Sequence, residues 1–196
     1  MRFRFDMDKT LAAAGYLLSL GGGRCSILKL VKMLYYADRM ALECWHRTIT
    51  GDAFYSLPEG PIVSTAYDLM KGIGPKNLQE RWFCFVQPRQ GNTIALKQMP
   101  DTAFLSQAEK ETLEASFRKI SSMSNVSAWM HTFPEWENPK GSSKRIEPKT
   151  VLRLLTPLTD EQISAIEEEV AKATFMEDRF CAPAGGCGAR HEVLVA

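Results

Sequence analysis

The carboxylate of Asp38 is the group in this sequence whose position most needs a chemical explanation. It lies within residues 26–45, SILKLVKMLYYADRMALECW, a stretch without Gly or Pro in which apolar residues recur at spacings of three and four. Such spacing predicts an amphipathic helix, and Asp38 projects from its apolar stripe between Leu34, one turn before, and Leu42, one turn after. Burying a carboxylate is strongly unfavourable unless other groups pair with it or donate hydrogen bonds to it.

Two roles fit such a carboxylate. As a catalytic group, Asp38 would lie in an apolar pocket with a raised pKa, and His131 as its partner would make a small hydrolase. As a structural anchor, it would accept hydrogen bonds from backbone N–H groups or from a neighbouring Tyr, His or Arg. We favour the anchor, since a helix predicted to begin just after Gly60 offers N–H donors and a favourable dipole for an anion.

Common catalytic and metal-binding patterns are absent from the sequence. Gly21–Gly23 lacks the strand and the Lys-Ser/Thr pair of a phosphate-binding loop, and neither G-x-S-x-G nor H-E-x-x-H occurs. Cys181, Cys187 and His191 could supply three metal ligands, but their spacing matches no common zinc pattern and no fourth ligand is evident. We therefore expect a non-enzymatic protein without a metal or another cofactor.

The composition is that of an ordinary globular protein and argues against several classes of function. Of the 196 residues 45% are hydrophobic and 24% charged, and the net charge of +1 provides no general attraction for nucleic acid or membranes. No apolar run approaches the roughly 18 residues that a membrane span requires. The five cysteines form no paired pattern, which fits a reducing cytoplasm.

Charge is unevenly distributed between the two ends of the chain. Residues 1–50 hold eight Lys or Arg and four Asp or Glu, whereas residues 151–196 hold four and eight. These ends could face each other or water, or the acidic end could meet a basic partner. Lys140, Lys144 and Arg145 lie in a Ser/Gly loop without the alternating aromatic residues of a nucleic-acid platform, so we expect no nucleic-acid binding there.

Local patterns predict a mainly α fold of the α+β class, a compact helical domain of about six to seven helices with one small β-hairpin. The hairpin is placed at residues 81–98, where RWFCFVQ and TIALKQ alternate around a Gln-Gly-Asn turn. Residues 46–60 and 137–148 are expected to be loops. The expected helices, with the residues that signal their starts, are 8–20 (Asp8), 26–45 (Ser26), one opening at Gly60-Pro61, one after a Ser106–Glu109 capping box, 126–130 (Asn125), 148–155 (Pro148) and one from Thr159 or Asp160.

The central helix also has a polar side. Tyr36 is the one aromatic side chain there, so another segment must cover it or a partner must bind it. The residues on this side are Lys29, Lys32, Tyr36, Arg39 and Glu43.

The order of these motifs resembles the SocA-like, or Panacea, antitoxin domain, a phage-associated protein family. That family has a Lys-Leu-x-Lys-Leu-x-Tyr-type helix, a turn-rich stretch, a Gly-Pro helix start followed by Tyr, and later a His followed closely by Trp. The chain departs from it at Pro134, which shortens the helix that carries the His. The resemblance covers about residues 8–136, and its matching residues are Lys29, Leu30, Lys32, Tyr35, Tyr36, Gly60, Pro61, Tyr67, Ser106, Glu109, His131 and Trp136, with Asp38 inside the first motif.

The resemblance implies a mainly helical, cytoplasmic antitoxin that neutralises a co-encoded protein toxin by direct binding. Family members are paired with toxins of unrelated type, so the class of toxin does not follow. Some relatives are implicated as adaptors that hand the toxin to a protease, which implies a protease complex as a further partner. Antitoxins often repress their own operon, so a DNA-binding transcriptional regulator is an alternative, although the chain has no basic recognition helix.

This comparison also divides the chain into three regions. Residues 1–136 would form the Panacea-like core, residues 137–180 a loop and helices packed on that core, and residues 181–196 a loosely held tail. Variable partners require surface outside a shared core. The residues expected to take part in recognition are Tyr36, Lys140, Lys144, Arg145, Glu167, Glu168 and Glu169.

Overall fold

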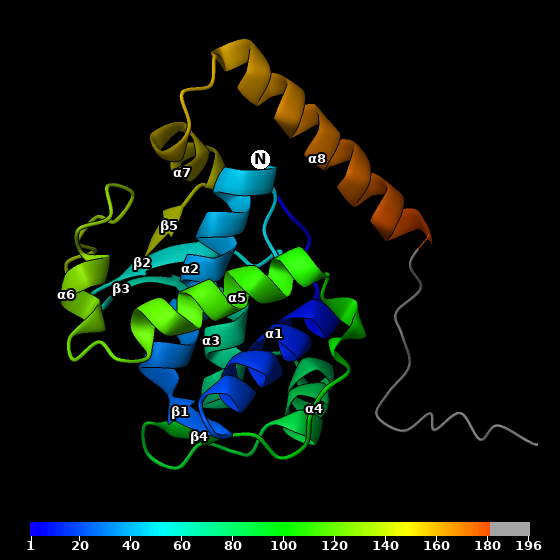
Figure 1. Cartoon of the computed structure of the whole chain (residues 1–196). Helices are drawn as coiled ribbons and strands as arrows, with labels where there is room; N and C mark the ends of the chain where they lie inside the picture. Colours follow the sequence, from blue (N-terminus) through cyan, green and yellow to red (C-terminus); the bar gives the residue numbers. More distant parts are fainter. Residues whose placement is uncertain (181–196) are drawn as a thin grey trace, which may run out of the picture.

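The computed structural model describes residues 1–180, which form eight α-helices and two small antiparallel sheets (Figure 1). The mainly α class with a few strands is confirmed, with one more helix and one more sheet than the sequence patterns predict. The helices are α1 (Met7–Leu20), α2 (Ile27–Trp45), α3 (Ser64–Lys71), α4 (Lys76–Phe85), α5 (Gln107–Ile120), α6 (Val126–Met130), α7 (Pro148–Leu155) and α8 (Asp160–Phe180), besides a 3-10 turn at Thr102–Phe104. The strands are β1 (Arg24–Ser26), β2 (Phe54–Leu57), β3 (Gly60–Val63), β4 (Thr93–Ala95) and β5 (Lys144–Ile146).

Helix α2 is the centre of the fold, as its apolar stripe predicts. It begins after Ser26, whose hydroxyl accepts a hydrogen bond from the Lys29 N–H (3.2 Å), and ends at His46 in a left-handed conformation (φ 56°). Helices α1, α5 and α7 and strand β3 all contact it (Figure 1). Its fully buried residues include Asp38 and also Lys32, so part of its polar side is covered.

The larger sheet is built on a hairpin that the sequence patterns do not predict. Strands β2 and β3 pair antiparallel, with Phe54 opposite Val63, and β5 pairs with the other edge of β2. The prediction of a loop at 46–60 and of a helix opening at Gly60-Pro61 is therefore wrong, because α3 begins only at Ser64. A proline is compatible with β3 because this strand lies at the sheet edge, where a missing N–H is tolerated.

The hairpin predicted at residues 81–98 is wrong in its first strand. That stretch belongs largely to α4, which buries Trp82. The predicted turn forms, since Gln90 bridges Thr93 and Val86 bridges Leu96 antiparallel. The second strand exists as β4, and it pairs along its length with β1 just before α2, with Cys25 opposite Ile94. Short apolar runs fit a helix or a strand, and partners far away in the chain decide between them.

Most predicted helix starts agree with the structure. The capping box of Ser106 and Glu109 is formed at α5, Asn125 caps α6, and Pro148 opens α7. The segment 137–148, however, is not a loop throughout, since it contains β5 and completes the larger sheet.

The cap of helix α1 lies two residues before the predicted one. The Asp6 carboxylate, and not that of Asp8, accepts the hydrogen bond from the Lys9 N–H (3.0 Å). Asp8 instead forms an ion pair with Arg81 on α4. An acidic residue at the start of a helix can cap the helix or pair with a cation, and Asp8 pairs with the cation because Arg81 lies nearby.

Helix α8 lies along the outside of the molecule and meets the start of the chain (Figure 1). Its Ile163 and Ile166 side chains are buried, while the Glu167 carboxylate binds the Lys149 ammonium on α7 (2.5 Å) and the amino group of Met1. The basic first residues and the acidic last helix therefore face each other in part, as one interpretation of the charge pattern predicts.

Residues 181–196 lie outside the described part of the chain, and with them the predicted tail and the possible ligands Cys181, Cys187 and His191. Within residues 1–180, no helix is long and apolar enough to cross a membrane. The same residues contain no group of three or more His, Cys, Asp or Glu placed to hold a metal ion. The division into a core, a packed C-terminal part and a tail stays a prediction.

Candidate functional site

Asp38 is fully buried in α2, and the loop after the helix engages its carboxylate completely. Oδ1 accepts hydrogen bonds from the N–H groups of Ile49 (2.7 Å) and Thr50 (3.0 Å), and Oδ2 accepts one from the Thr50 hydroxyl. Burial raises the pKa of Asp38 to about 7, although these hydrogen bonds oppose the shift. The geometry is that of a structural anchor, but the donors belong to this loop and not to a helix start after Gly60.

The helix start that we expected to bind Asp38 binds Asp52 instead. The Asp52 carboxylate accepts hydrogen bonds from the N–H groups of Thr65 (2.9 Å) and Ala66 (2.8 Å) in the first turn of α3, where the helix dipole favours an anion. Burial raises the pKa of Asp52, and the hydrogen bonds oppose this shift. The Asp52 N–H donates to the Thr50 hydroxyl oxygen (3.1 Å), so one threonine links the two buried carboxylates.

The loop held in this way also holds the first residues of the chain. The Asp6 N–H donates to the Thr50 carbonyl (2.8 Å), and the Arg4 carbonyl lies so close to Gly51 that a Cβ there would stand 1.7 Å from its oxygen. Gly51 has φ +66°, a conformation that favours glycine. Asp38 therefore fixes, through one loop, both the end of α2 and the path of the N-terminal segment.

Lys32 is a second ionisable group buried in α2, although it lies on the side of the helix that the sequence predicts to be polar. Its ammonium donates to the Pro61 carbonyl at the start of β3 (2.8 Å). Burial lowers the pKa of Lys32 to about 7, and the Glu59 carboxylate opposes the shift. The hairpin turn covers this side chain closely, since a Cβ added at Gly60, where φ is +100°, would lie 3.2 Å from the Lys32 Nζ.

The sequence patterns did not identify Glu135, a carboxylate that binds two side chains of α2. It is buried, and its Oε1 accepts hydrogen bonds from the Tyr35 hydroxyl (2.8 Å) and from Arg39 Nε (2.6 Å). The Arg39 guanidinium also lies 4.4 Å from the centre of the Phe133 ring. Burial, followed by the charge of Glu135, raises the pKa of Tyr35 well above its ordinary value. This network ties α2 to the segment after α6.

The family-motif residues His131 and Trp136 tie the same segment to the hairpin turn. A ring nitrogen of His131 lies 2.8 Å from the Pro58 carbonyl, and the Trp136 indole N–H donates to the Leu57 carbonyl (3.0 Å). The two rings stack with centroids 3.9 Å apart and an angle of 19° between them. Although Pro134 shortens the helix that carries His131, the chain still brings the His131 and Trp136 rings into contact.

The hydrolase alternative requires Asp38 and His131 to act on one substrate, and the geometry gives them different surroundings. All hydrogen bonds to the Asp38 side chain come from residues 49–50, whereas the His131 ring lies on the hairpin turn and Trp136. Asp38 has no solvent exposure, so a substrate could not reach it in this conformation. These different surroundings do not favour a pairing of the two residues.

The remaining motif residues also make internal contacts. Leu30 is fully buried, and the Lys29 ammonium donates to the Ser121 carbonyl at the end of α5 (2.6 Å). The Lys71 ammonium lies 4.1 Å from the centre of the Tyr67 ring. These contacts indicate that the motif describes how the core is assembled.

Tyr36, expected either to be covered or to bind a partner, is largely covered by α6 and the turn after it. Its ring meets the Trp129 ring edge-on at 5.0 Å between centroids and lies 6.1 Å from the Phe133 ring. The side chain is half-buried, so only the exposed part of its ring could contact a partner.

The charged residues predicted to recognise a partner lie on two surfaces. On the β5 side, Lys144 pairs with Glu137, and Arg145 pairs with Glu147 (2.9 Å). Lys140 is exposed, with φ 51°. On α8, the acidic run does not act as one surface: Glu167 is engaged internally, Glu168 lies 3.8 Å from Lys172, and Glu169 is exposed. Recognition by these residues stays a prediction.

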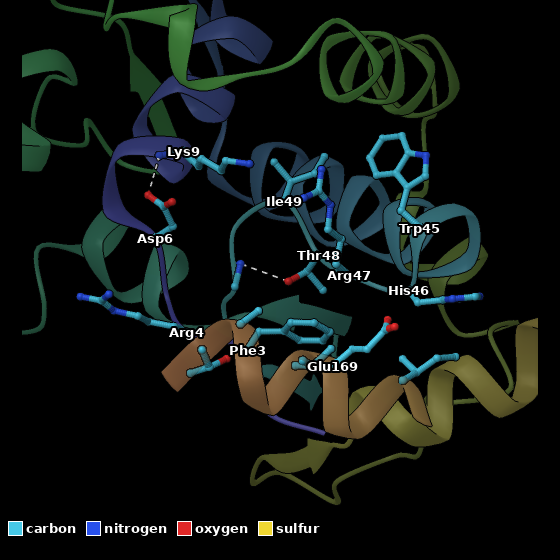
Figure 2. Close-up of a pocket in the computed structure, with 15 residues that line it drawn as sticks. Phe3, Arg4, Asp6, Lys9, Trp45, His46, Arg47, Thr48, Ile49 and Glu169 are labelled. Carbon is cyan, nitrogen blue, oxygen red and sulfur yellow. Dashed lines mark hydrogen bonds between the residues drawn. The ribbon is translucent and has the colours of Figure 1, made fainter. Parts of the chain in front are cut away.

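A hollow of about 290 Å³ opens where the anchored segments meet α8 (Figure 2). Its walls are the N-terminal segment, residues 45–49 at the end of α2, and one side of α8. Figure 2 shows the Phe3 ring next to α8, with Arg47 and Ile49 on the opposite side of the hollow. The Gly51 N–H donates to the Thr48 hydroxyl (3.1 Å) and holds the loop that forms this wall. No sequence pattern predicted this site, because its walls come from three separate parts of the chain.

The comparisons with known proteins bear on the part of the chain that contains these networks. A family model described as "Antitoxin SocA-like, Panacea domain" matches residues 30–137, which is more than half of the chain. The matched region runs from α2 to the residue after Trp136, so it includes Asp38, Lys32, the hairpin and Glu135, but neither α8 nor the N-terminal segment. The comparison with curated proteins and the comparison with solved structures gave no match.

Proposed function

The chain belongs to the SocA-like antitoxin family with a Panacea domain, and from this premise we propose that it neutralises a co-encoded protein toxin by binding it directly. The proposal places this activity in the cytoplasm, as part of a phage-associated toxin–antitoxin system. The partner is a protein, and no cofactor takes part.

The observation that supports this proposal most is the inward use of the ionisable groups in the matched region. Asp38, Asp52, Lys32 and Glu135 are all buried, and each is bonded to another element of the fold. A general acid, general base or nucleophile must reach a substrate, whereas an anchor must be enclosed. Enclosed groups of this kind suit a rigid scaffold that binds its partner through its outer surface.

The test is a growth experiment with the neighbouring open reading frame. We expect its product to stop growth when expressed alone and to be harmless when this chain is expressed with it. Co-purification of the two proteins should accompany the rescue. Growth that is unaffected by the neighbouring product, or a toxicity that this chain does not relieve, would contradict the proposal.

Delivery of the bound toxin to a protease is a finer form of the same proposal, suggested by the family. In that case the half-life of the toxin in cells should shorten when this chain is present, and should lengthen again when the protease is removed. If neutralisation persists without the protease, binding alone is sufficient and the adaptor role is not needed.

A further inference from the structure

We propose that a groove between α8 and the N-terminal segment is where an acidic, partly apolar segment of the protein partner docks. This inference rests on the proposed function and names the surface and the chemistry of the partner that it binds. The α8 groove consists of the hollow in Figure 2 and a second hollow of about 470 Å³ beside it. The two hollows adjoin each other, because Phe3, Arg4, Gly51 and Thr174 line both.

The rim of the α8 groove is basic. Arg2 and Arg47 are exposed, and neither forms an ion pair or a hydrogen bond with another described residue. Arg145 lies at the far end of the groove, and its one ion pair is with the exposed Glu147 two residues along the same strand end. A surface pair of this kind contributes little free energy, so Arg145 can exchange its partner.

The acidic residues that line the groove do not offset this charge. The Asp6 carboxylate caps α1, and the Asp52 carboxylate is buried at the start of α3. Glu169 on α8 is the acidic side chain left at the rim. Arginines without carboxylate partners therefore outnumber free carboxylates, which favours a partner that brings its own Asp and Glu side chains.

Apolar side chains, including aromatic rings, form part of the groove wall. Phe3 and Trp45 line the groove and are half-buried, as is Val170 on α8. Aromatic side chains beside arginines are the commonest hot spots of protein–protein interfaces.

A nucleic acid would favour a wider basic surface than these few cations provide, and the net charge of the chain is +1. The groove therefore suits a peptide segment with apolar and acidic side chains.

The groove is held in shape before any partner arrives. The Glu167 carboxylate fixes α8 to Lys149 on α7, and the Asp6 N–H fixes the N-terminal segment to the Thr50 carbonyl. The buried Asp38 holds the loop that carries Thr50. A preformed site lowers the entropy cost of binding, because fewer groups become ordered in the complex.

The test compares charge reversals in the full chain, with the purified product of the neighbouring open reading frame as the probe and isothermal titration as the measurement. The double variant Arg2→Glu, Arg47→Glu should weaken the affinity by about tenfold or more, and the wild-type affinity should fall as salt is added. The matched control is Arg89→Glu, an exposed arginine that lines a separate hollow near α4 and forms no ion pair with another described residue. It should change the affinity by less than about twofold. Circular dichroism and thermal melting establish that each variant is folded.

Several outcomes would contradict the proposal that the partner docks in the groove and leave the proposed function intact. One is a double variant that binds the neighbouring product as tightly as the wild type. Another is a wild-type dimer in sedimentation that the reversals dissociate, since the groove would then hold a second copy of this chain. A third is salt-sensitive binding of duplex DNA that the same reversals abolish. If the wild type itself does not bind the neighbouring product, the proposed function fails, and the groove proposal fails with it.

Discussion

Asp38 illustrates, at the scale of single residues, how a buried carboxylate can organise a surface that it never touches. Its three donors come from Ile49 and Thr50, and Thr50 in turn holds Asp6 at the edge of the α8 groove. The free energy that keeps the groove in place therefore depends on a group with no solvent exposure. Two properties of Asp38 can be measured directly: its contribution to stability and its pKa.

Asp38→Ala should lower the free energy of unfolding by about 3 kcal/mol, because three buried donors lose their acceptor. Asp38→Asn keeps one oxygen for the two N–H groups and should cost about 1–2 kcal/mol. Urea unfolding at neutral pH measures both values. Equal losses for the two variants would show that the hydrogen bonds to this oxygen do not stabilise the fold.

The pKa of Asp38 predicts how the stability difference depends on pH. Burial raises this pKa from its ordinary value of 3.8 to about 7, so the folded state holds its proton more tightly than the unfolded state. The stabilising contribution is present below pH 3.8 and is lost as the pH rises towards 7. The free energy of unfolding of the wild type, measured relative to Asp38→Asn, should therefore fall over this range. A difference that stays constant or rises would contradict the assigned pKa.

Glu135 is the second residue whose removal is informative. Glu135→Ala leaves the Arg39 guanidinium and the Tyr35 hydroxyl without their acceptor and should cost about 3 kcal/mol or more in the free energy of unfolding. Glu135→Gln keeps an acceptor for the hydroxyl and should cost less, about 1–2 kcal/mol. Urea unfolding distinguishes the two variants, and equal costs would argue against the network.

Sequence patterns identify residue-scale features where donor and acceptor are close in the chain. Ser26 at α2 and the Ser106–Glu109 capping box are predicted correctly, because each pair lies within three residues. Asp38 is recognised as an anchor, because the apolar stripe makes its position exceptional. Its partners are misassigned, and the roles of Asp52 and Glu135 are missed, because a local pattern carries no information about groups that meet only after folding.

At the scale of elements, the loop after α2 connects the core to the N-terminal segment. It is held from inside by Asp38 and Asp52, and it holds residues 4–6 on its outer side. Gly51 is the point of closest approach between the two segments. This arrangement makes the loop the element on which the α8 groove most depends.

Gly51→Ala should therefore displace the N-terminal segment. Its φ of +66° disfavours alanine, and the new Cβ would stand 1.7 Å from the Arg4 carbonyl oxygen, so we expect a loss of about 2 kcal/mol or more in the free energy of unfolding. Hydrogen exchange at the Asp6 amide should also become faster, because its bond to Thr50 would be broken.

The matched control is Gly91→Ala, where φ is +59° and no atom lies within 4 Å of the added Cβ. This variant carries only the backbone cost of about 1 kcal/mol. Protection of the Asp6 amide that is the same in both variants would show that the close approach at Gly51 does not hold the N-terminal segment.

The elements that sequence patterns misassign are the short strands. The β2–β3 hairpin and β5 lie in segments rich in turn residues and are stabilised by their strand partners, and β3 also contacts α2 and α6. The first half of the predicted hairpin at 81–98 is helical, since Trp82 packs into the core from α4. The long helices are predictable because their apolar period repeats over several turns, whereas a strand of three or four residues has no such repeat.

At the scale of the whole molecule, the family core and the surfaces around it have different tasks. The matched region, residues 30–137, contains the enclosed polar networks, while the N-terminal segment and α8 lie outside it and form much of the groove. The fold class follows from helix periodicity, but the groove could not be predicted, because segments from both ends of the described chain meet to make it. We propose that a rigid interior supports a binding surface.

The most direct test of this account is a titration of toxin activity with the purified chain, in the absence of any protease. An inhibitor that acts by binding should reduce the activity of the neighbouring gene product in proportion to the amount added and abolish it near equal molar amounts. Inhibition by far less than one molar equivalent would mean that the chain acts as a catalyst on the toxin, and activity that persists at a large excess would mean that binding is not the mechanism.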